Sequence, residues 1–377
     1  MFLKNLQLTN FRNYRDCSIV FDSMKTLVVG ENAQGKTNVL EAVYYLSHND
    51  SYRIQKDSEL ILWGEPFCKI KGDVTKYDMD LSLEVIINPP SKKILKVNDI
   101  KKTKSSDFLG NIVSVNFCVD DLLLIRGVPQ DRRKWIDSSI GSIYPAYKDR
   151  LDKYNKIRTH RNNILKDYKS NPQSGLMKTL DAFDEQLIIT GSNIIYLRLK
   201  YLKEIEPIAK EKHKIIAESE NLSMVYQSSV FDDIDISEDK NFSIEEISKR
   251  FEEKLSERKQ EEIIRAQTLV GPHRDDVKFF INGFDSLSFA SQGQQRTIVL
   301  SLKLSELDII KEKIDEKPVL LLDDVLAELD KTRQNFLLKS IGSDIQTIIT
   351  SVDILSFEKE FLKDVKIYKV KDGSIDG

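Results

Sequence analysis

The sequence predicts an α/β fold, in which a mixed sheet with an antiparallel β addition carries an inserted helical lobe. An apolar segment runs directly into the glycine loop GENAQGKT at 30–37, and a second apolar segment, VLLLDD at 319–324, ends in two carboxylates. Between them, from about 130 to 220, the apolar residues follow helical spacing. At 377 residues the chain also exceeds the usual size of one hydrophobic core. We therefore expect a head formed by 1–128 and 265–377, with the helical lobe at 129–264.

Strands are expected on both sides of the glycine loop. Short alternating or apolar runs occur at 3–11, 17–21, 26–30, 68–74, 80–87, 93–100 and 111–117. A helix should follow the loop directly, because apolar residues recur every three or four positions between Val39 and Leu46. Mixed strands around a glycine loop indicate an α/β core with an antiparallel addition.

The helical lobe is predicted to contain a short antiparallel hairpin. The turn falls in KSNPQSG at 169–175, where proline and glycine interrupt the helical pattern. Helices of about 30 residues would be roughly 45 Å long, which is an arm rather than a long coiled coil. An acidic loop at 232–241 precedes a further helix at 244–265, and strand signals resume at 277–289.

Composition excludes several classes of protein. The net charge of −3 with a charged fraction of 31% argues against a uniformly basic nucleic-acid binder, but it permits local basic patches. Cys17, Cys68 and Cys118 lie far apart, without the spacing of metal ligands, as expected for reduced thiols in a cytosolic protein. No apolar run approaches the roughly 20 residues of a membrane span. We expect a cytoplasmic protein with no membrane partner.

The loop GENAQGKT has the composition of a phosphate-binding loop. Gly30 and Gly35 permit backbone conformations that turn successive N–H groups inward, and the helix N-terminus adds partial positive charge. Lys36 supplies an ammonium group to the β- and γ-phosphates, and Thr37 offers a hydroxyl to Mg²⁺. The remaining loop residues that we expect to bind the nucleotide are Glu31, Asn32, Ala33 and Gln34.

The strand VLLLDD ends in two acids that suit different tasks. Asp323 suits coordination of Mg²⁺, partly through water. Asp324 suits the orientation of an attacking water, since phosphoryl transfer depends on positioning and charge compensation. Adjacent strand residues point to opposite faces, so the two carboxylates are not expected to share one role.

The segment SQGQQR at 291–296 opens an apolar helix predicted over 297–310. Ser291 and the N–H groups near Gly293 would form an anion site for the γ-phosphate of a nucleotide held by a second subunit. Ser291 is also a suitable N-cap for its own helix, which is the structural alternative. Together with the glycine loop, the segment predicts a protein that uses ATP to close a homodimer.

The motif set resembles ABC-type ATPase heads of DNA repair and chromosome maintenance, and in detail it resembles the RecF family of bacterial recombination mediators. The segments that carry the resemblance are NFRNY at 10–14, NAQGKTNVLEAV at 32–43, GVPQDRRKWID at 127–137, RNNILK at 161–166, TLVGPHRDD at 268–276, SQGQQRT at 291–297 and LLLDDVLAELD at 320–330. The first and last are shared with Rad50- and SMC-like heads, whereas the RecF resemblance is most specific in GxPxxRR, GPHRDD and SQGQQR.

The resemblance implies residue roles. Lys36, Asp323 and Asp324 would be catalytic, and Thr37 would join Asp323 at the metal. Ser291, Gly293 and Gln294 would complete the partner's ATP site, with Asp330 at the dimer seam. The switch position falls at Ser351 or Asp353, where transporters usually carry histidine, so slow hydrolysis is expected. No Q-loop glutamine can be placed.

The resemblance also implies a biological role. ATP and Mg²⁺ would drive a weak, DNA-stimulated ATPase that closes as a dimeric clamp on single-stranded or double-stranded DNA. Such a clamp would support DNA replication, recombinase loading at gaps and the SOS response to DNA damage, with RecR- and RecO-type partners.

Basic residues form two candidate DNA-binding clusters, which suit sequence-independent contacts to phosphates. The first comprises Lys92, Lys93, Lys96, Lys101, Lys102 and Lys104, and the second comprises Arg126, Arg132, Arg133, Lys134, Arg150, Lys153, Lys156, Arg158 and Arg161. Arg132 and Arg133 could instead pair with acids of the chain. Arg53 resembles an arginine that links DNA to ATP in related heads.

Three alternatives remain open from the sequence. A Rad50-like end-processing head is disfavoured by the short helical lobe and by the lack of a zinc-hook CxxC motif. The nucleotide-binding subunit of a transporter would require a shorter span between the glycine loop and SQGQQR. An interaction scaffold with vestigial ATPase activity is not excluded.

Overall fold

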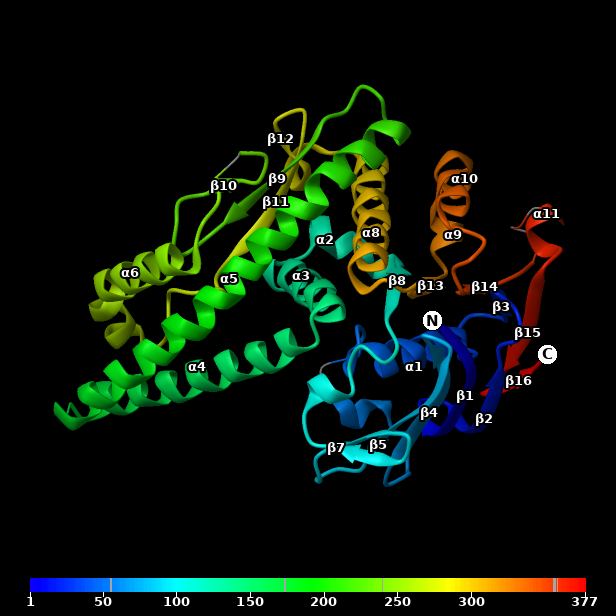
Figure 1. Ribbon diagram of the computed structural model, residues 1–377, viewed down its shortest axis with the longest axis horizontal. Coiled ribbons are helices and arrows are strands. Elements are labelled where there is room, and N and C mark those ends of the chain that lie inside the picture. The colour runs from blue at the N-terminus through cyan, green and yellow to red at the C-terminus, as the bar shows by residue number, and fades with distance from the viewer. Residues whose placement is uncertain (55, 173, 239, 355–356, 358) are drawn as a thin grey trace. The chain divides into compact units, whose positions relative to one another are not determined.

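The computed structural model describes residues 1–377 except 55, 173, 239, 355–356 and 358 (Figure 1). The chain forms two compact units. The first contains 1–121, 142–145 and 303–377, and the second contains 122–141 and 146–302. Each unit is described by itself below.

One sheet of the first unit is wholly antiparallel, in the order β2-β1-β4-β5-β6-β7. Its strands are β1 (Phe2–Phe11), β2 (Tyr14–Val20), β4 (Cys68–Lys76), β5 (Met79–Ile87), β6 (Ile94–Val97) and β7 (Ile100–Lys102). Alternating burial along β4 places Cys68, Ile70 and Val74 in the core. The strand runs expected at 3–11, 17–21, 68–74 and 80–87 are confirmed. The run expected at 93–100 is divided, because a turn at Asn98 and Asp99 separates β6 from β7.

The other sheet of the first unit is mainly parallel, in the order β16-β15-β3-β14-β13-β8. Only the edge strand β16 runs antiparallel to its neighbour. The bounds are β3 (Lys25–Val29), β8 (Ser114–Cys118), β13 (Val319–Asp323), β14 (Thr347–Ser351), β15 (Val365–Lys371) and β16 (Ser374–Asp376). The two sheets together confirm the predicted α/β head with an antiparallel addition.

Helix α1 (Lys36–His48) contacts both sheets of the first unit. Val39, Leu40 and Val43 are fully buried and join one hydrophobic core with strands of the antiparallel sheet and with Val319 and Leu321 of β13. This packing fixes the start of α1 at the carboxyl end of β3. The shorter helices of this unit are η1 (Asp57–Leu60), η2 (Ser105–Asp107), η3 (Val119–Leu122), which ends at the unit boundary, α9 (Val325–Glu328), α10 (Lys331–Ser340) and α11 (Lys359–Leu362).

The second unit combines helices with a small sheet in the order β10-β9-β11-β12. Its strands are β9 (Leu222–Gln227), β10 (Ile234–Asp235), β11 (Asp276–Ile281) and β12 (Phe284–Asp285). Its helices are α2 (Leu123–Arg126), α3 (Pro129–Ile143), α4 (Ala146–Ser170), α5 (Ser174–Ile216), α6 (Ile244–Arg265) and α7 (Ser286–Phe289), and α8 (Gln292–Ile314) begins in this unit and continues into the first.

The predicted hairpin is formed by α4 and α5, which lie side by side (Figure 1). Helix α5 has 43 residues, so it is longer than expected, about 65 Å. It continues through Pro207, and Ile205 and Ala209 on either side are fully buried. Packing of that stripe therefore offsets the backbone hydrogen bond that proline removes.

The division of the chain differs from the expected boundary at 264/265. Residues 265–302 belong to the second unit, because β11 pairs with β9 from Asp276↔Gln227 to Ile281↔Leu222. The strand that we assigned to the head therefore completes the small sheet of the helical unit. The segment SQGQQR lies wholly in this unit as well.

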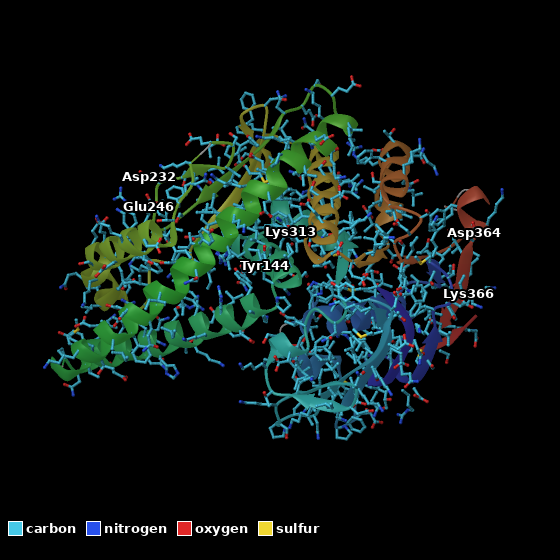
Figure 2. The ribbon with its side chains drawn as sticks, in the orientation of Figure 1. Tyr144, Asp232, Glu246, Lys313, Asp364 and Lys366 are labelled. Atoms are coloured by element: carbon cyan, nitrogen blue, oxygen red, sulfur yellow. The ribbon has the colours of Figure 1, made fainter. Side chains whose placement is uncertain are left out.

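Charged side chains such as Asp232, Glu246 and Asp364 are exposed to solvent (Figure 2). Among the described residues, no helix is both long enough and apolar enough to cross a bilayer.

Candidate nucleotide-binding site

The glycine loop connects the end of β3 to the start of α1, as the sequence predicted. Gly35 has a φ of 120°, a conformation that other residues rarely adopt, and a Cβ on Gly30 would lie 2.4 Å from the carbonyl oxygen of Val370. Both glycines are therefore required by the shape of the loop. Ala33 also has a positive φ, of 66°.

The turn between β1 and β2 holds this loop from one side. Asn13 Nδ2 donates to the carbonyl of Gln34 at 2.7 Å, and the Tyr14 hydroxyl donates to the carbonyl of Gly35 at 3.1 Å. Asn38 on α1 donates to Asn13 Oδ1 at 2.8 Å. We had used NFRNY only as a mark of resemblance, and the structure shows what two of its residues contact. Their distance in sequence from the loop is why no local pattern indicated this.

Lys36 is only 4% exposed, and its ammonium remains within the loop. Lys36 Nζ donates to the carbonyls of Gly30 at 2.8 Å and Glu31 at 3.0 Å. Among the described residues, no ion pair compensates this buried cation, which is held by backbone oxygens. The loop therefore concentrates positive charge where a polyphosphate is expected.

Asp323 lies at the end of β13 and is 6% exposed. Its Oδ1 accepts hydrogen bonds at 2.9 Å from the hydroxyls of both Thr37 and Thr350. Its Oδ2 accepts at 3.1 Å from the hydroxyl of Tyr52. Burial raises the pKa of Asp323 in spite of these three donors.

No ion pair joins Asp323 to a side chain in the described part of the chain. A carboxylate and a threonine hydroxyl form an oxygen donor set of the type that Mg²⁺ prefers. Thr37 and Asp323 are thus brought together as predicted, and they fit a hard divalent cation.

Tyr52 is a site residue that the sequence analysis missed. Its ring packs edge-on against Tyr44, with centroids 5.0 Å apart, and this contact directs the hydroxyl to Asp323. The segment SYR offered a signal, but we selected its arginine. Arg53 donates to Asn38 at 2.8 Å and Glu41 at 3.2 Å, so it has partners within the chain.

Asp324 differs from Asp323 in its backbone, because it has a φ of 53° at the start of α9. Its N–H donates to the Thr350 hydroxyl at 2.9 Å. Thr350 therefore contacts both acids. Of the predicted switch residues, Ser351 ends β14 and its hydroxyl donates to the carbonyl of Asp353 at 2.8 Å.

The segment SQGQQR forms a capped helix start. Ser291 Oγ accepts from the N–H of Gln294 at 3.2 Å, and Gln294 Oε1 accepts from the N–H of Ser291 at 2.8 Å. This reciprocal pair is a capping box with glutamine in place of glutamate. Ser291 is exposed. Capping by Ser291 is therefore shown, and a role toward a second subunit stays a prediction.

Two further contacts hold the same turn. Gln294 Nε2 donates to Glu220 Oε1 at 2.9 Å. Gln295, which we did not select, is buried and accepts at 2.6 Å from Arg126 Nε while donating to the carbonyl of Ala290. The turn is thus fixed before any partner arrives. Thr297 donates to the carbonyl of Gly293 at 3.0 Å.

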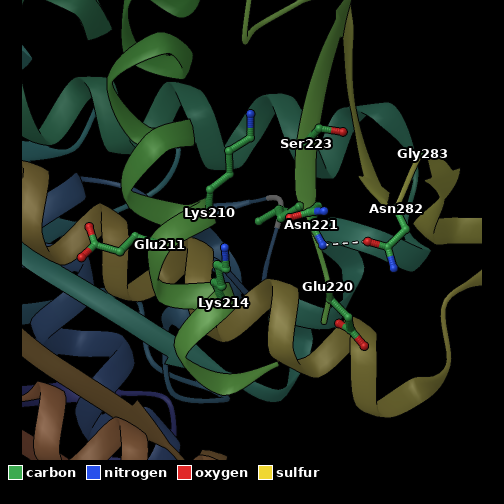
Figure 3. A pocket seen from close by; sticks show the side chains of 9 residues that line it. Lys210, Glu211, Lys214, Glu220, Asn221, Ser223, Asn282 and Gly283 are labelled. Atoms are coloured by element: carbon green, nitrogen blue, oxygen red, sulfur yellow. Dashed lines mark hydrogen bonds between the residues drawn. The ribbon is translucent and has the colours of Figure 1, made fainter. Parts of the chain in front are cut away.

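Glu220 also borders an open hollow of about 840 Å³ (Figure 3). Its lining includes Lys210, Lys214 and Glu211, and the N–H of Asn221 donates to Asn282 at 2.8 Å. Because the lining carries both signs of charge, it does not define one class of ligand.

Several residues of the second basic cluster are structural. Arg132 forms two hydrogen bonds with Asp276, at 2.7 and 2.9 Å, and Arg133 donates to the carbonyl of Asp275. Arg161 is fully buried and pairs with Asp184 and Glu262, each at 2.6 Å. Including Arg161 among the candidate DNA contacts was therefore wrong. In the first cluster, Lys93 pairs with Asp57, and Lys96 pairs with Glu84.

The fold and this site define a P-loop nucleotide-binding head of the ABC type, with a helical unit attached. The family described as RecF/RecN/SMC N terminal domain matches residues 2–376. The DNA replication and repair protein RecF of Bacillus cytotoxicus is 41% identical over 377 residues, which cover 100% of this chain and 98% of that protein. The RecF protein of Bacillus cereus strain G9842 shows the same identity and coverage. The chain belongs to the RecF family.

Solved structures agree with this assignment. A structure described as the recombination mediator protein RecF with ATP in the RecFOR pathway has a TM-score of 0.90 and 34% identity, with 100% of this chain and 97% of that chain covered. A second RecF structure, with ATPrS, has a TM-score of 0.88, 34% identity and the same coverage. An Smc head bound to a domain of ScpA, at 15% identity and a TM-score of 0.53, shares the fold alone and matches over 100% of this chain and 97% of that chain.

Proposed function

We propose that this chain is an ATP-dependent DNA-binding protein of replication and recombinational repair, which closes as a dimeric clamp and hydrolyses ATP slowly. The observation that carries the proposal is that the buried carboxylate of Asp323 accepts a hydrogen bond from Thr37 at the start of α1. It also accepts from the hydroxyls of Tyr52 and Thr350. Family membership and the RecF structure named with ATP support the nucleotide.

Each residue of the loop has a defined task in this proposal. Backbone N–H groups from Gly30 to Thr37 would surround the phosphates, and Lys36 would exchange its two carbonyl contacts for phosphate oxygens. Thr37 and Asp323 would hold Mg²⁺, which supplies positive charge against the phosphates when bound. Asp324 would orient the attacking water.

Closure would require a second copy. Ser291, Gly293 and Gln294 would complete the site of the partner subunit, with Asp330 at the seam, where it now caps α10. Because ATP would contact both copies only in the dimer, it would shift the equilibrium toward the dimer. Slow hydrolysis would reopen the clamp.

DNA binding would use the cations that remain exposed. Lys92, Lys101 and Lys104 are exposed in and beside the β6–β7 region, and Arg150, Lys153 and Lys156 are exposed along α4. Such side chains suit phosphate contacts on single-stranded or double-stranded DNA. Recombinase loading with RecR- and RecO-type partners, a part in the SOS response and a cytoplasmic location belong to the same proposal and rest on the family.

Light scattering tests the proposal directly. With ATP and Mg²⁺ the mass should double, and DNA should strengthen the effect. Absence of a nucleotide-dependent dimer at micromolar protein would refute the clamp.

The substitution Ser291→Arg separates closure from nucleotide binding. It should leave ATP binding intact and abolish dimerisation, because the long cation would occupy the predicted γ-phosphate position. Normal dimerisation of this variant would refute the role assigned to Ser291. DNA affinity should fall steeply with salt, and a salt-insensitive complex would argue against phosphate contacts.

A further inference from the structure

Exposed apolar side chains lie beside each of the two nucleotide motifs. Trp63 is 98% exposed, and Phe284 and Phe289 are 63% and 72% exposed, with Leu287 at 51%. Single exposed apolar residues are common, but a fully exposed tryptophan and an aromatic cluster are typical of interaction surfaces. The site proposed above uses none of these four residues.

Trp63 is held at a fixed place relative to the glycine loop. Its segment is tied to the β1–β2 turn by hydrogen bonds from the N–H of Arg12 to the carbonyl of Leu60 at 2.7 Å and from the N–H of Leu62 to the carbonyl of Asn10 at 2.8 Å. The same turn supplies Asn13, which binds the carbonyl of Gln34. The segment of Trp63 is therefore linked to the phosphate-binding loop through hydrogen bonds to a single shared turn.

The local turn explains why the indole projects outward. The N–H of Glu65 donates to the carbonyl of Leu62 at 3.0 Å, and Gly64 has a φ of 88°. This is the geometry of a tight turn with glycine at its third position and Trp63 at its second. The salt bridge between Arg15 and Glu65, at 3.0 Å, also ties the turn to β2.

The aromatic cluster is fixed in the same way beside Ser291. The rings of Phe284 on β12 and Phe289 on α7 meet edge to face, with centroids 6.0 Å apart. Asp285 caps α7 by accepting from the N–H of Leu287 at 3.2 Å. Phe289 therefore ends a short fixed helix that leads directly into the capped start of α8.

We propose that Trp63 of one copy packs on the patch formed by Phe284, Leu287 and Phe289 of a second copy. This inference rests on the proposed function, because a two-fold dimer that sets Ser291 over the partner's glycine loop brings together what flanks the two motifs. The symmetry repeats the contact twice. A tryptophan in an apolar pocket is a typical centre of binding energy.

The contact gives closure an apolar component that nucleotide alone does not provide. The contact would form only after Ser291 approaches the partner's loop, so it would stabilise the closed dimer. In the open state the aromatic surface would stay exposed. The partner is thus a second copy of this chain, recognised by complementarity between its own two exposed surfaces.

Tryptophan emission tests the contact without altering the fold. The chain has two tryptophans, and Trp135 is buried, so the difference between the wild type and Trp63→Phe reports Trp63. ATP and Mg²⁺ should move this difference spectrum to shorter wavelength in the wild type and should not do so with Ser291→Arg. An unchanged spectrum in a protein that has dimerised would overturn the inference and leave the proposed function intact.

Trp63→Ala should weaken the nucleotide-dependent dimer about tenfold or more. Ile264→Ala removes another apolar side chain, 68% exposed on α6, and should leave the dimer unchanged. Equal dimerisation of wild type and Trp63→Ala would contradict the contact. Absence of any ATP-dependent dimer in the wild type would refute both proposals.

Cross-linking identifies the copy that supplies each side. Trp63→Cys in a tagged copy and Phe289→Cys in an untagged copy, with the three native cysteines replaced, should be joined by a short bifunctional maleimide only when ATP is present. A chain that carries both substitutions and cross-links only within itself would show an intramolecular contact and overturn the inference. The absence of any cross-link, between copies or within one, would also overturn the inference.

Discussion

Two buried carboxylates, one in each unit, are stabilised in opposite ways. Glu262 in the second unit is fully buried, and its Oε2 lies 2.6 Å from Arg161, while its Oε1 accepts from the N–H of Leu269 at 2.6 Å. Asp323 in the first unit is nearly as buried but meets three hydroxyl groups and no described cation. Burial raises the pKa of both groups.

The difference indicates what each carboxylate is for. A buried carboxylate that already has an arginine is part of the structure, because losing either partner leaves a charge without compensation. A buried carboxylate that meets neutral donors has no compensating charge, and a cation that bound to it would supply that charge. The comparison therefore separates an acid paired with arginine from the acid that we propose to bind the metal.

The largest effect is expected for Arg161→Met. Removal of the guanidinium deprives both Glu262 and Asp184 of Arg161, and should lower the free energy of unfolding by about 3–5 kcal/mol. Urea denaturation measures this. Arg258→Met removes an exposed ion pair with Glu261 on the same helix and should change the free energy of unfolding far less than Arg161→Met does. Equal losses would contradict the structural role of Arg161.

Acid should destabilise the second unit through His273. Its Nδ1 meets the Tyr154 hydroxyl at 2.7 Å and its Nε2 meets the carbonyl of Thr268 at 3.1 Å, and burial lowers its pKa to about 3 from 6.5. Below pH 6.5 the imidazole of His273 becomes protonated in the unfolded chain but stays neutral in the folded chain. Stability should therefore fall by about 1.4 kcal/mol per pH unit toward pH 3.

The matched variant is His273→Gln, which keeps one donor and one acceptor but cannot titrate. Unfolding should be followed at several pH values between 6.5 and 5. The wild type should lose about 2 kcal/mol more than the variant over this range. If the free energies of unfolding of the wild type and His273→Gln fell equally with pH, His273 would have to accept a proton in the folded state.

A smaller loss is expected for Tyr52→Phe. The substitution removes the donor to Asp323 Oδ2, and a hydrogen bond to a charged acceptor of this length is worth about 1.5 kcal/mol. In an Asp323→Asn background the loss should shrink, because a neutral acceptor binds more weakly. A double-mutant cycle by urea denaturation measures the coupling between Tyr52 and Asp323. If the effects of the two substitutions were additive, Tyr52 would not interact with Asp323.

The smallest change in stability is expected for Asp323→Asn. Because the pKa of Asp323 is raised, its ionised form costs stability at neutral pH, and that cost disappears as pH falls through the raised pKa. The variant should therefore unfold within about 1 kcal/mol of the wild type, yet lose the Mg²⁺ response of nucleotide binding. A destabilisation as large as that of Arg161→Met would show that Asp323 is as important for folding as the buried ion pair of Arg161.

The sequence predicted what local pattern determines. Helix α6 was predicted at its observed bounds, and the structure shows that a local capping box of Ser243 and Glu246 sets its start. The glycine loop and the strand that ends in Asp323 were predicted as contiguous motifs. By contrast, Tyr52 and Thr350 reach Asp323 from separate segments, so only tertiary packing reveals them.

Charge was predicted less well than periodicity. Arg132 and Arg161 appeared as parts of a basic cluster, but each is neutralised by an acid more than 100 residues away. The boundary at 264/265 was missed for the same reason, since β11 takes its partner from β9. Ion pairs and strand pairs between residues so far apart in sequence produce no local pattern from which they could be predicted.

The glycine loop has one dependence that concerns the synthesis of the chain. The N–H of Asp372 donates to Gln34 Oε1 at 2.6 Å, across 338 residues, and the carbonyl of Val370 closes on Gly30. A nascent chain that has exposed Gln34 on the ribosome must still wait for β15 before the loop is braced. The loop is thus braced only after a further 338 residues have been synthesised.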